Sequence, residues 1–318
     1  MENEEKVTEQ KENQKKPSRK KTIILYSSIV VVAVALGVTA GVLAKLNMSK
    51  ETTDYSGFDP EQYRVDSKEL LEQYKANPRK NFTAAELINI GLEKYRQCEN
   101  SYSIGVGNAD AGIVNQTIRN AQIKNGNKYF EESISNSSMV HIANRVEQTD
   151  IGGKIYFYKG KATGAEACKY TDNKVEYVGQ DYKKEWGKTL DEMFIYLISN
   201  DTVLKDSDSI EKTDDGLIKI KVGLDTDISS YYYKVQMKTI SNLSGLPTFD
   251  YLKQSYVFTS DMKLLYCQVD EKYQASMGPI TTSIHNIIDY YYHADEYQTI
   301  PTLEERINYS LEGEVKYE

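Results

Sequence analysis

Three histidines are the residues of this sequence best suited to acid–base catalysis or metal binding. His141 and His285 lie on the polar faces of predicted strands, and neither has a Cys, Asp or Glu at a ligand spacing. The third, His293, follows the tyrosine run at 290–292. A histidine on the wet face of a strand is most often simply solvated. We therefore expect neither a metal site nor a catalytic base here.

An acidic cluster is the next candidate for ion binding; its members are Asp206, Asp208, Glu211, Asp214 and Asp215. A calcium loop needs a third oxygen ligand where Ile210 stands and a glycine where Glu211 stands, so the pattern fails. The sequence has no nucleophile elbow, zinc-protease motif or phosphate loop. Gly105 and Gly107 lack the strand–turn–helix context of a dinucleotide site. We expect a solvated acidic loop, no cofactor and no enzymatic activity.

Cysteine and tyrosine content sets further limits. The three cysteines exclude a four-cysteine zinc site. Cys98 and Cys267 fall on apolar faces, as buried thiols do. A disulfide between two of the three cysteines is an alternative outside the cell, and the sequence does not choose its partners. The chain has 26 tyrosines. They fit contact surfaces, but β-propensity together with a compositional bias explains them as well.

Residues 22–44 contain no charged side chain. As a helix they extend about 34 Å, enough to cross a hydrocarbon core of about 30 Å. The sequence therefore predicts one transmembrane helix, preceded by a basic tail at residues 1–21. Gly37 and Gly41 form a small-xxx-small pair that would let two such helices pack as a homodimer, although ordinary use of small residues in a membrane helix is the favoured explanation.

Basic residues gather just before the predicted span, as KKPSRKK, and only Lys45 and Lys50 follow it closely. The positive-inside rule places the N-terminus in the cytoplasm and the acidic C-terminal portion outside the cell membrane. A cleaved signal peptide is the alternative, but its apolar core usually has only about 7–15 residues. The net charge of −8 excludes a general nucleic-acid binder. The bias toward Tyr, Lys, Asn and Ile is typical of a Gram-positive bacterium.

Capping residues predict several helices. Asp66 begins a short helix that must end before Pro78. Thr83-Ala84-Ala85-Glu86 is a capping box, and the apolar positions that follow it form one stripe reaching Tyr102. A second capping box at 189–192 predicts a helix through Ile198. The segment 227–240 favours helix over strand.

Alternating apolar and polar residues predict strands from about residue 112 onward, joined by turns such as Gly126, Asp215-Gly216 and Ser260-Asp261. Residues 165–188 have no clear pattern. The predicted fold class is α+β: one transmembrane helix followed by a curved antiparallel sheet with interspersed helices. After the tail and the span, we expect a stalk with a short helix at 45–80, an extracytoplasmic sheet domain at 81–293 and a loosely attached acidic C-terminal tail at 294–318.

The order of these elements resembles a known superfamily. A capped helix ending in GLEKYRQCENSYSI precedes strands containing KNGNKYFEESIS and GGKIYFYKGK. This resembles the lipoprotein-carrier superfamily, the LolA/LppX-like half-barrels, over about residues 80–293. The resemblance implies a half-barrel-like sheet that wraps helices and holds acyl chains or hydrophobic partners in its concavity. The superfamily's carrier for outer-membrane lipoproteins is soluble, so the predicted tether of this chain puts a shuttle function in doubt. The superfamily has no fixed motif that assigns ligand contacts to residues here.

These observations favour a membrane-tethered, extracytoplasmic, non-catalytic binding module for lipid, acyl chains or an envelope lipoprotein. A structural protein that scaffolds another envelope protein is the first alternative. A hydrolase of envelope polymers is the second, and it needs two juxtaposed titratable groups that the sequence spacing does not show.

Overall fold

A computed structural model describes residues 57–112, 114–138, 140–149, 153–186, 188–190, 196–241, 243–277 and 280–317. The predicted tail, the predicted transmembrane helix and the Gly37/Gly41 pair lie outside the described residues. Among the helices of the described ranges, none combines the length and the apolar character that a membrane crossing requires.

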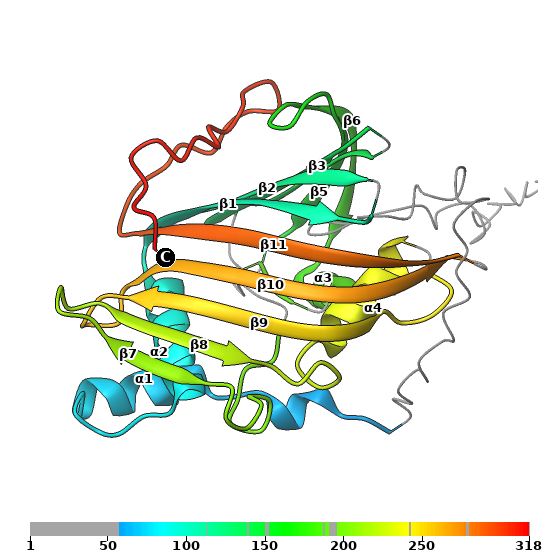
Figure 1. Ribbon diagram of the computed structural model, residues 1–318. Coiled ribbons are helices and arrows are strands. Elements are labelled where there is room, and N and C mark those ends of the chain that lie inside the picture. Colours follow the sequence, from blue (N-terminus) through cyan, green and yellow to red (C-terminus); the bar gives the residue numbers. More distant parts are fainter. Residues whose placement is uncertain are drawn as a thin grey trace, which may run out of the picture.

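Eleven described strands form one antiparallel sheet (Figure 1). Their order across the sheet is β6-β5-β4-β3-β2-β1-β11-β10-β9-β8-β7. The strands are β1 (Asn100–Asp110), β2 (Asn115–Asn125), β3 (Lys128–Asn136), β4 (His141–Gln148), β5 (Ile155–Ala162), β6 (Cys168–Tyr177), β7 (Ser209–Lys212), β8 (Ile218–Gly223), β9 (Thr248–Phe258), β10 (Leu264–Met277) and β11 (Ile280–Ala294). The sheet is strongly curved, and β3 to β6 turn up and away from the plane of β7 to β11. The predicted curved antiparallel sheet is confirmed.

Local turns explain why neighbouring strands pair. Gly126 joins β2 to β3 with φ of 56°, and Gly216 joins β7 to β8 with φ of 84°. Residues with a Cβ rarely adopt such angles, so glycine at these two positions fixes the register of each hairpin. The closing contact is long-range, because β11 pairs with β1 from Ser101↔Ala294 to Asp110↔His285.

Within the described ranges, five helices accompany the sheet: η3 (Pro60–Tyr63), α1 (Ser67–Ala76), α2 (Ala84–Gln97), α3 (Gly179–Trp186) and α4 (Tyr231–Ser241). Asp66 caps α1, and Thr83 with Glu86 forms the predicted capping box of α2. These caps satisfy amide groups that a helix start leaves without a partner. The predicted helices at both places are confirmed. The helical interpretation of 227–240 holds from Tyr231 onward, whereas residues 227–230 form turns.

The two faces of the sheet are covered by different parts of the chain. The inner face, which bears Ile118, Val269 and Ile288, packs against α1, α2 and α4 in the main hydrophobic core. The outer face of β1 to β6, which bears Ile123 and Phe130, packs against the C-terminal segment. This segment, residues 295–317, is called the strap below; it is red in Figure 1, arcs over the β1–β6 half and ends beside β10 and β11.

Several sequence-based expectations are wrong. The strap is not loosely attached, because Tyr309 is buried and Ile300, Ile307 and Leu311 pack beside it. The apolar residues of this acidic segment are too widely spaced to form a periodic pattern. Residues 196–199 adopt no helix, so the helix expected to reach Ile198 does not extend there; residues 191–195 lie outside the described ranges.

One further difference concerns a strand boundary, and two irregular pairings occur within the sheet. Tyr102 belongs to β1 rather than to the α2 stripe, because pairing with β2 and β11 along the whole strand overrides the helical spacing. A bulge between Leu264 and Tyr266 places Leu264 in the inner core and turns Leu265 to the outer face. Residues 165–188, which have no clear sequence pattern, contain β6. The register of β6 shifts opposite Tyr158 and Gly160, and this shift breaks the alternation of apolar and polar residues.

Candidate binding site

The inner face is a candidate site because the resemblance to the half-barrel superfamily implies a ligand-holding concavity there. Helices α2 and α4 fill the space over β8 to β11, and Phe258 packs so closely on α2 that a Cβ on Gly91 would stand 2.2 Å from its ring. Close packing of this kind leaves no room for an acyl chain between α2 and the sheet.

A buried carboxylate lies within this core. Glu271 of β10 accepts hydrogen bonds from the Tyr196 hydroxyl (2.6 Å), the Tyr233 hydroxyl (3.0 Å) and the Asn286 amide (2.9 Å). Its side chain is fully buried, and this burial raises the pKa of its carboxyl above the usual 4.5, against the opposing effect of the three donors. Burial likewise raises the pKa of both tyrosines. The cluster ties α4 and residue 196 to the sheet.

The inner face of β1 to β3 is more polar. Glu131 and Lys188 form an ion pair of 2.9 Å in which both side chains are almost fully buried. The Asn120 amide donates to the Tyr290 hydroxyl across β1 at 3.2 Å. Gly105 of β1 leaves room for the Tyr290 ring, because a Cβ at this position would stand only 2.6 Å from it. The cavity beside this layer, lined by Tyr95, Gln122 and Lys124 among others, has a volume of about 30 Å³. That is room for about one or two water molecules.

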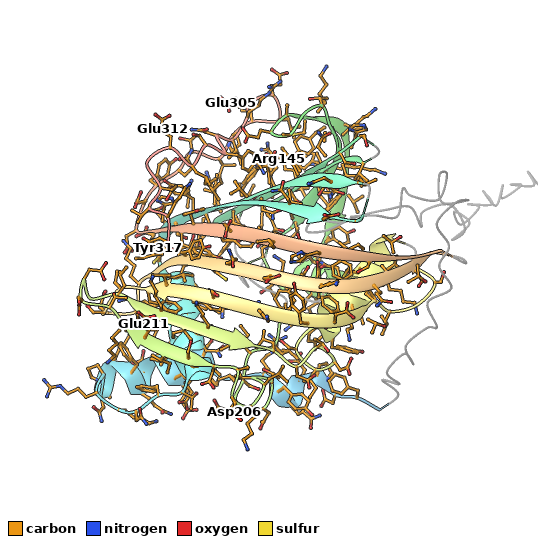
Figure 2. All side chains as sticks on the ribbon, viewed as in Figure 1. Arg145, Asp206, Glu211, Glu305, Glu312 and Tyr317 are labelled. Carbon is orange, nitrogen blue, oxygen red and sulfur yellow. The ribbon has the colours of Figure 1, made fainter. Side chains whose placement is uncertain are left out.

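The outer face contains a second site, built around Arg145 of β4. Arg145 is only 2% exposed and lies beneath the strap (Figure 2). Its guanidinium donates to the carbonyl oxygens of Pro301 and Thr302, the latter at 2.9 Å, and to Glu147 Oε1 at 2.5 Å. It also lies 4.7 Å from the centre of the Phe130 ring. The five fixed donors of arginine suit such a set of acceptors.

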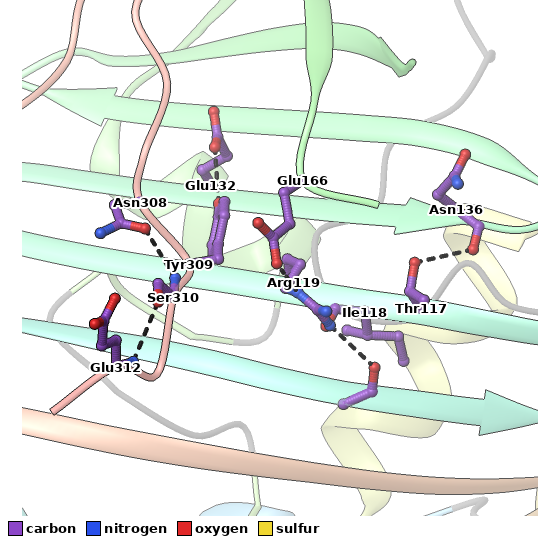
Figure 3. Close-up of polar contacts among 11 residues, drawn as sticks. Thr117, Ile118, Arg119, Glu132, Asn136, Glu166, Asn308, Tyr309, Ser310 and Glu312 are labelled. Carbon is purple, nitrogen blue, oxygen red and sulfur yellow. Dashed lines mark hydrogen bonds and ion pairs between the residues drawn. The ribbon is translucent and has the colours of Figure 1, made fainter. Parts of the chain in front are cut away.

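Glu132 of β3 provides a second tie to the strap. It accepts hydrogen bonds from the hydroxyls of Tyr309 (2.7 Å) and Tyr170 (2.6 Å), as the close-up in Figure 3 shows for Tyr309. Burial raises the pKa of both tyrosines, so they remain protonated donors at neutral pH. On the same face, Arg119 donates to Glu166 at 3.1 Å and holds the loop before β6.

An open groove lies between the strap and the ends of β3 and β4. Its volume is about 360 Å³, and most of its wall is apolar. The strap contributes Ile300, Pro301, Thr302 and Leu303, and the sheet side contributes Lys128, Tyr129, Arg145, Glu147, Gln148 and Thr149. Ligand pockets commonly have volumes of about 300–1,000 Å³. The groove therefore has the size and the apolar character of a small-ligand site.

The histidines considered in the sequence are dispersed. His141 is exposed and contacts Asn136 at 2.8 Å. His285 lies 2.9 Å from Asp270 and 3.0 Å from the Tyr251 hydroxyl, which cross-strand pairing brings together although their spacing in sequence gives no signal. His293 contacts Glu314 at 2.8 Å. Among the described residues, no group of three or more His, Cys, Asp or Glu side chains is placed to hold a metal ion.

The other candidates are separated as well. The members of the acidic cluster are exposed, and Figure 2 shows Asp206 at the opposite side of the molecule from Glu305 of the strap. Cys98, Cys168 and Cys267 are free thiols. Sequence reasoning missed Arg145 as a site residue, and it missed the whole strap.

Comparisons with known proteins give distant likenesses. No protein-family model and no curated protein matches the chain. LprF from Mycobacterium bovis is similar at a TM-score of 0.31 and 11% identity, over 69% of this chain and 96% of that one. A DUF1329 family protein from Desulfovibrio piger is similar at 0.27 and 10%, over 68% and 93%. A porin-like protein from Bacteroides uniformis is similar at 0.18 and 11%, over 62% and 96%. Likenesses this distant do not assign a function.

Proposed function

We propose that the chain is a membrane-tethered, extracytoplasmic, non-catalytic binding module, and that its ligand is an acyl chain held in the groove beneath the strap. The groove itself supports the proposal most directly, because it joins a mostly apolar wall to a volume of about 360 Å³. The exposed Lys128 at its rim would suit an anionic head group. The tether is the uncharged segment 22–44, with the N-terminus in the cytoplasm.

The filled inner core restricts where such a ligand can bind. The LolA/LppX-like half-barrels suggest binding on the inner, helix-covered face, where α2 and Phe258 are in close contact. The outer groove is open and needs no displacement of helices. We therefore place the acyl chain on the outer face, in contact with Tyr129 and Leu303.

Photo-crosslinking tests this placement. A palmitic acid that carries a diazirine near its end is added to the full-length chain in membranes, and crosslinked peptides are mapped by mass spectrometry. We expect crosslinks on the peptides that contain Tyr129 and Leu303. The variant Leu303→Trp fills the groove and should reduce them at least about fivefold, whereas Leu204→Trp, at an exposed leucine 46% accessible in the loop 199–208, should not. Crosslinks elsewhere only, or equal labelling of both variants, would refute the site.

A protein-binding scaffold is the second candidate. The outer face of β8 to β11 favours it, because side chains such as Lys221, Lys253 and Ile287 are exposed there and the strap does not cover them. Crosslinking in intact cells should then recover one specific envelope protein, and recovery of none would argue against this function. Protease treatment of intact cells tests the topology, since a fully protected domain would contradict the extracytoplasmic assignment.

A further inference from the structure

His293 lies where the strap leaves the sheet and where it returns. The residue is the second-last of β11, and the strap begins two residues later at Asp295, which adopts φ of 63° and turns the chain away. Nε2 of His293 lies 2.8 Å from Glu314 at the returning end, and Nδ1 lies 3.6 Å from Glu296 at the departing end. One side chain therefore contacts both ends of the strap.

Both ring nitrogens of His293 lie near carboxylates, and only the charged ring interacts favourably with both at once. A neutral imidazole has one N–H, so it can donate to one carboxylate while its other nitrogen presents a lone pair to the second. The imidazolium carries a proton on each nitrogen and pairs with both. The ring is also held in place, because it stacks on Tyr102 of β1 with 4.1 Å between centres and 6° between planes.

The other titratable groups around His293 carry negative charge or stay neutral. Asp295 follows it closely in sequence and adds negative charge beside the two glutamates. Tyr102 is the group that β1 presents to it, and burial together with Glu296 and Glu314 raises the pKa of that hydroxyl, so it stays neutral. Tyr291 on the same strand face likewise has a pKa raised by burial. The surroundings are therefore carboxylates and neutral phenols.

We infer that His293 is a pH-sensitive clasp that holds the strap closed when it is protonated and loosens the strap when it is neutral. Histidine ordinarily changes charge between about pH 5 and 8. The consequence for ligand binding rests on the proposed function, because Ile300 to Leu303, four to seven residues after Glu296, form one wall of the groove. Acid would close this wall on the sheet, and neutral to alkaline pH would release it.

Hydrogen exchange of the full-length chain tests the clasp without any ligand. After correction for intrinsic exchange, strap amides at 300–311 should exchange about fivefold faster at pH 8 than at pH 5.5, the factor expected when one charge-assisted contact becomes a neutral one. His293→Gln and Glu314→Gln should each abolish this pH dependence. His285→Gln is the matched control, since His285 lies on the same strand face but contacts Asp270 and Tyr251 rather than the strap.

Equal corrected exchange at the two pH values, or a pH dependence that persists in both the His293→Gln and Glu314→Gln chains, would overturn the inference. If His293→Gln fails to fold, Glu314→Gln gives the same answer with the histidine intact. Acyl crosslinking is measured separately. A pH-dependent strap without crosslinks would leave the clasp standing and reject the acyl ligand, and the opposite result would do the reverse.

Discussion

Glu271 and Glu132 are two buried carboxylates that bind tyrosine hydroxyls in different surroundings. Each accepts hydrogen bonds from the hydroxyl groups of two tyrosines, and each joins the sheet to a segment outside it. The partner Tyr233 of Glu271 lies on α4, within the main core. The partner Tyr309 of Glu132 lies on the strap, which has no regular secondary structure. The first contact can be lost only when the core opens, whereas the second can be lost when one segment lifts away.

The comparison also explains much of the tyrosine content. A tyrosine ring supplies apolar area to a core, and its hydroxyl supplies a donor that a buried carboxylate requires. Phenylalanine would remove these hydroxyl donors from the carboxylates, and serine would leave the cores unfilled. Tyrosine therefore serves here as a connection between layers, beyond its preference for strands.

Substitution of each carboxylate should give the largest difference in stability between the two regions. Glu271→Ala removes a fully buried acceptor that three donors share, so we expect a loss of about 3 kcal/mol in the free energy of unfolding. Glu132→Ala should cost only about 1–2 kcal/mol, because Tyr309 can turn to water when the strap moves. Urea titration followed by circular dichroism measures both. Equal losses would show that the strap belongs to the same cooperative unit as the core.

The pH dependence of stability should differ between the regions as well. The folded-state pKa of Glu271 is raised above its usual 4.5 by burial, so its contribution to stability is full below that value and is lost as pH rises through the folded-state pKa. The chain should therefore lose stability relative to Glu271→Gln as pH increases from about 4.5. Urea titrations at several pH values check this. A constant difference between the two chains would contradict a raised pKa at Glu271.

Tyr309→Phe should act locally. The substitution removes the hydroxyl that donates to Glu132 and preserves the ring. We therefore expect strap amides to exchange about tenfold faster, equivalent to roughly 1.4 kcal/mol. Exchange of core amides in β10 should stay unchanged. Hydrogen exchange read by mass spectrometry resolves the two sets. Faster exchange in β10 as well would mean that the strap and the core open together.

Tyr170→Phe should have the smallest effect. Tyr170 lies on β6 within the sheet, and Tyr309 still donates to Glu132 after the substitution. We expect a loss of about 1 kcal/mol in the free energy of unfolding, without faster exchange in the strap. The same two measurements apply, and a strap that exchanges faster would show that Glu132 needs both hydroxyls to retain it.

Features encoded by neighbouring residues were predictable from the sequence. The capping box at Thr83 and the hairpin at Gly216 depend on residues within a few positions, and the structure confirms both. The sites depend on distant pairs instead. Tyr309 and Glu132 are 177 positions apart, and Arg145 reaches carbonyl groups that any sequence provides. Nothing in the spacing of Ile300, Ile307 and Leu311 indicates which face of the sheet they cover. The tail, the span and their topology remain predictions.

The shift of register in β6 has a consequence for crowded surroundings. An open sheet ends in two strands whose outward amides and carbonyls can recruit further chains into fibrillar aggregates. Here β7 has four exposed residues, and β6 is interrupted opposite Tyr158 and Gly160 and carries Lys169, Lys174 and Glu176. One edge strand is short, and the other is irregular and charged, so neither edge pairs well with strands of further chains. Both edges of the sheet therefore resist the addition of strands from other copies of the chain.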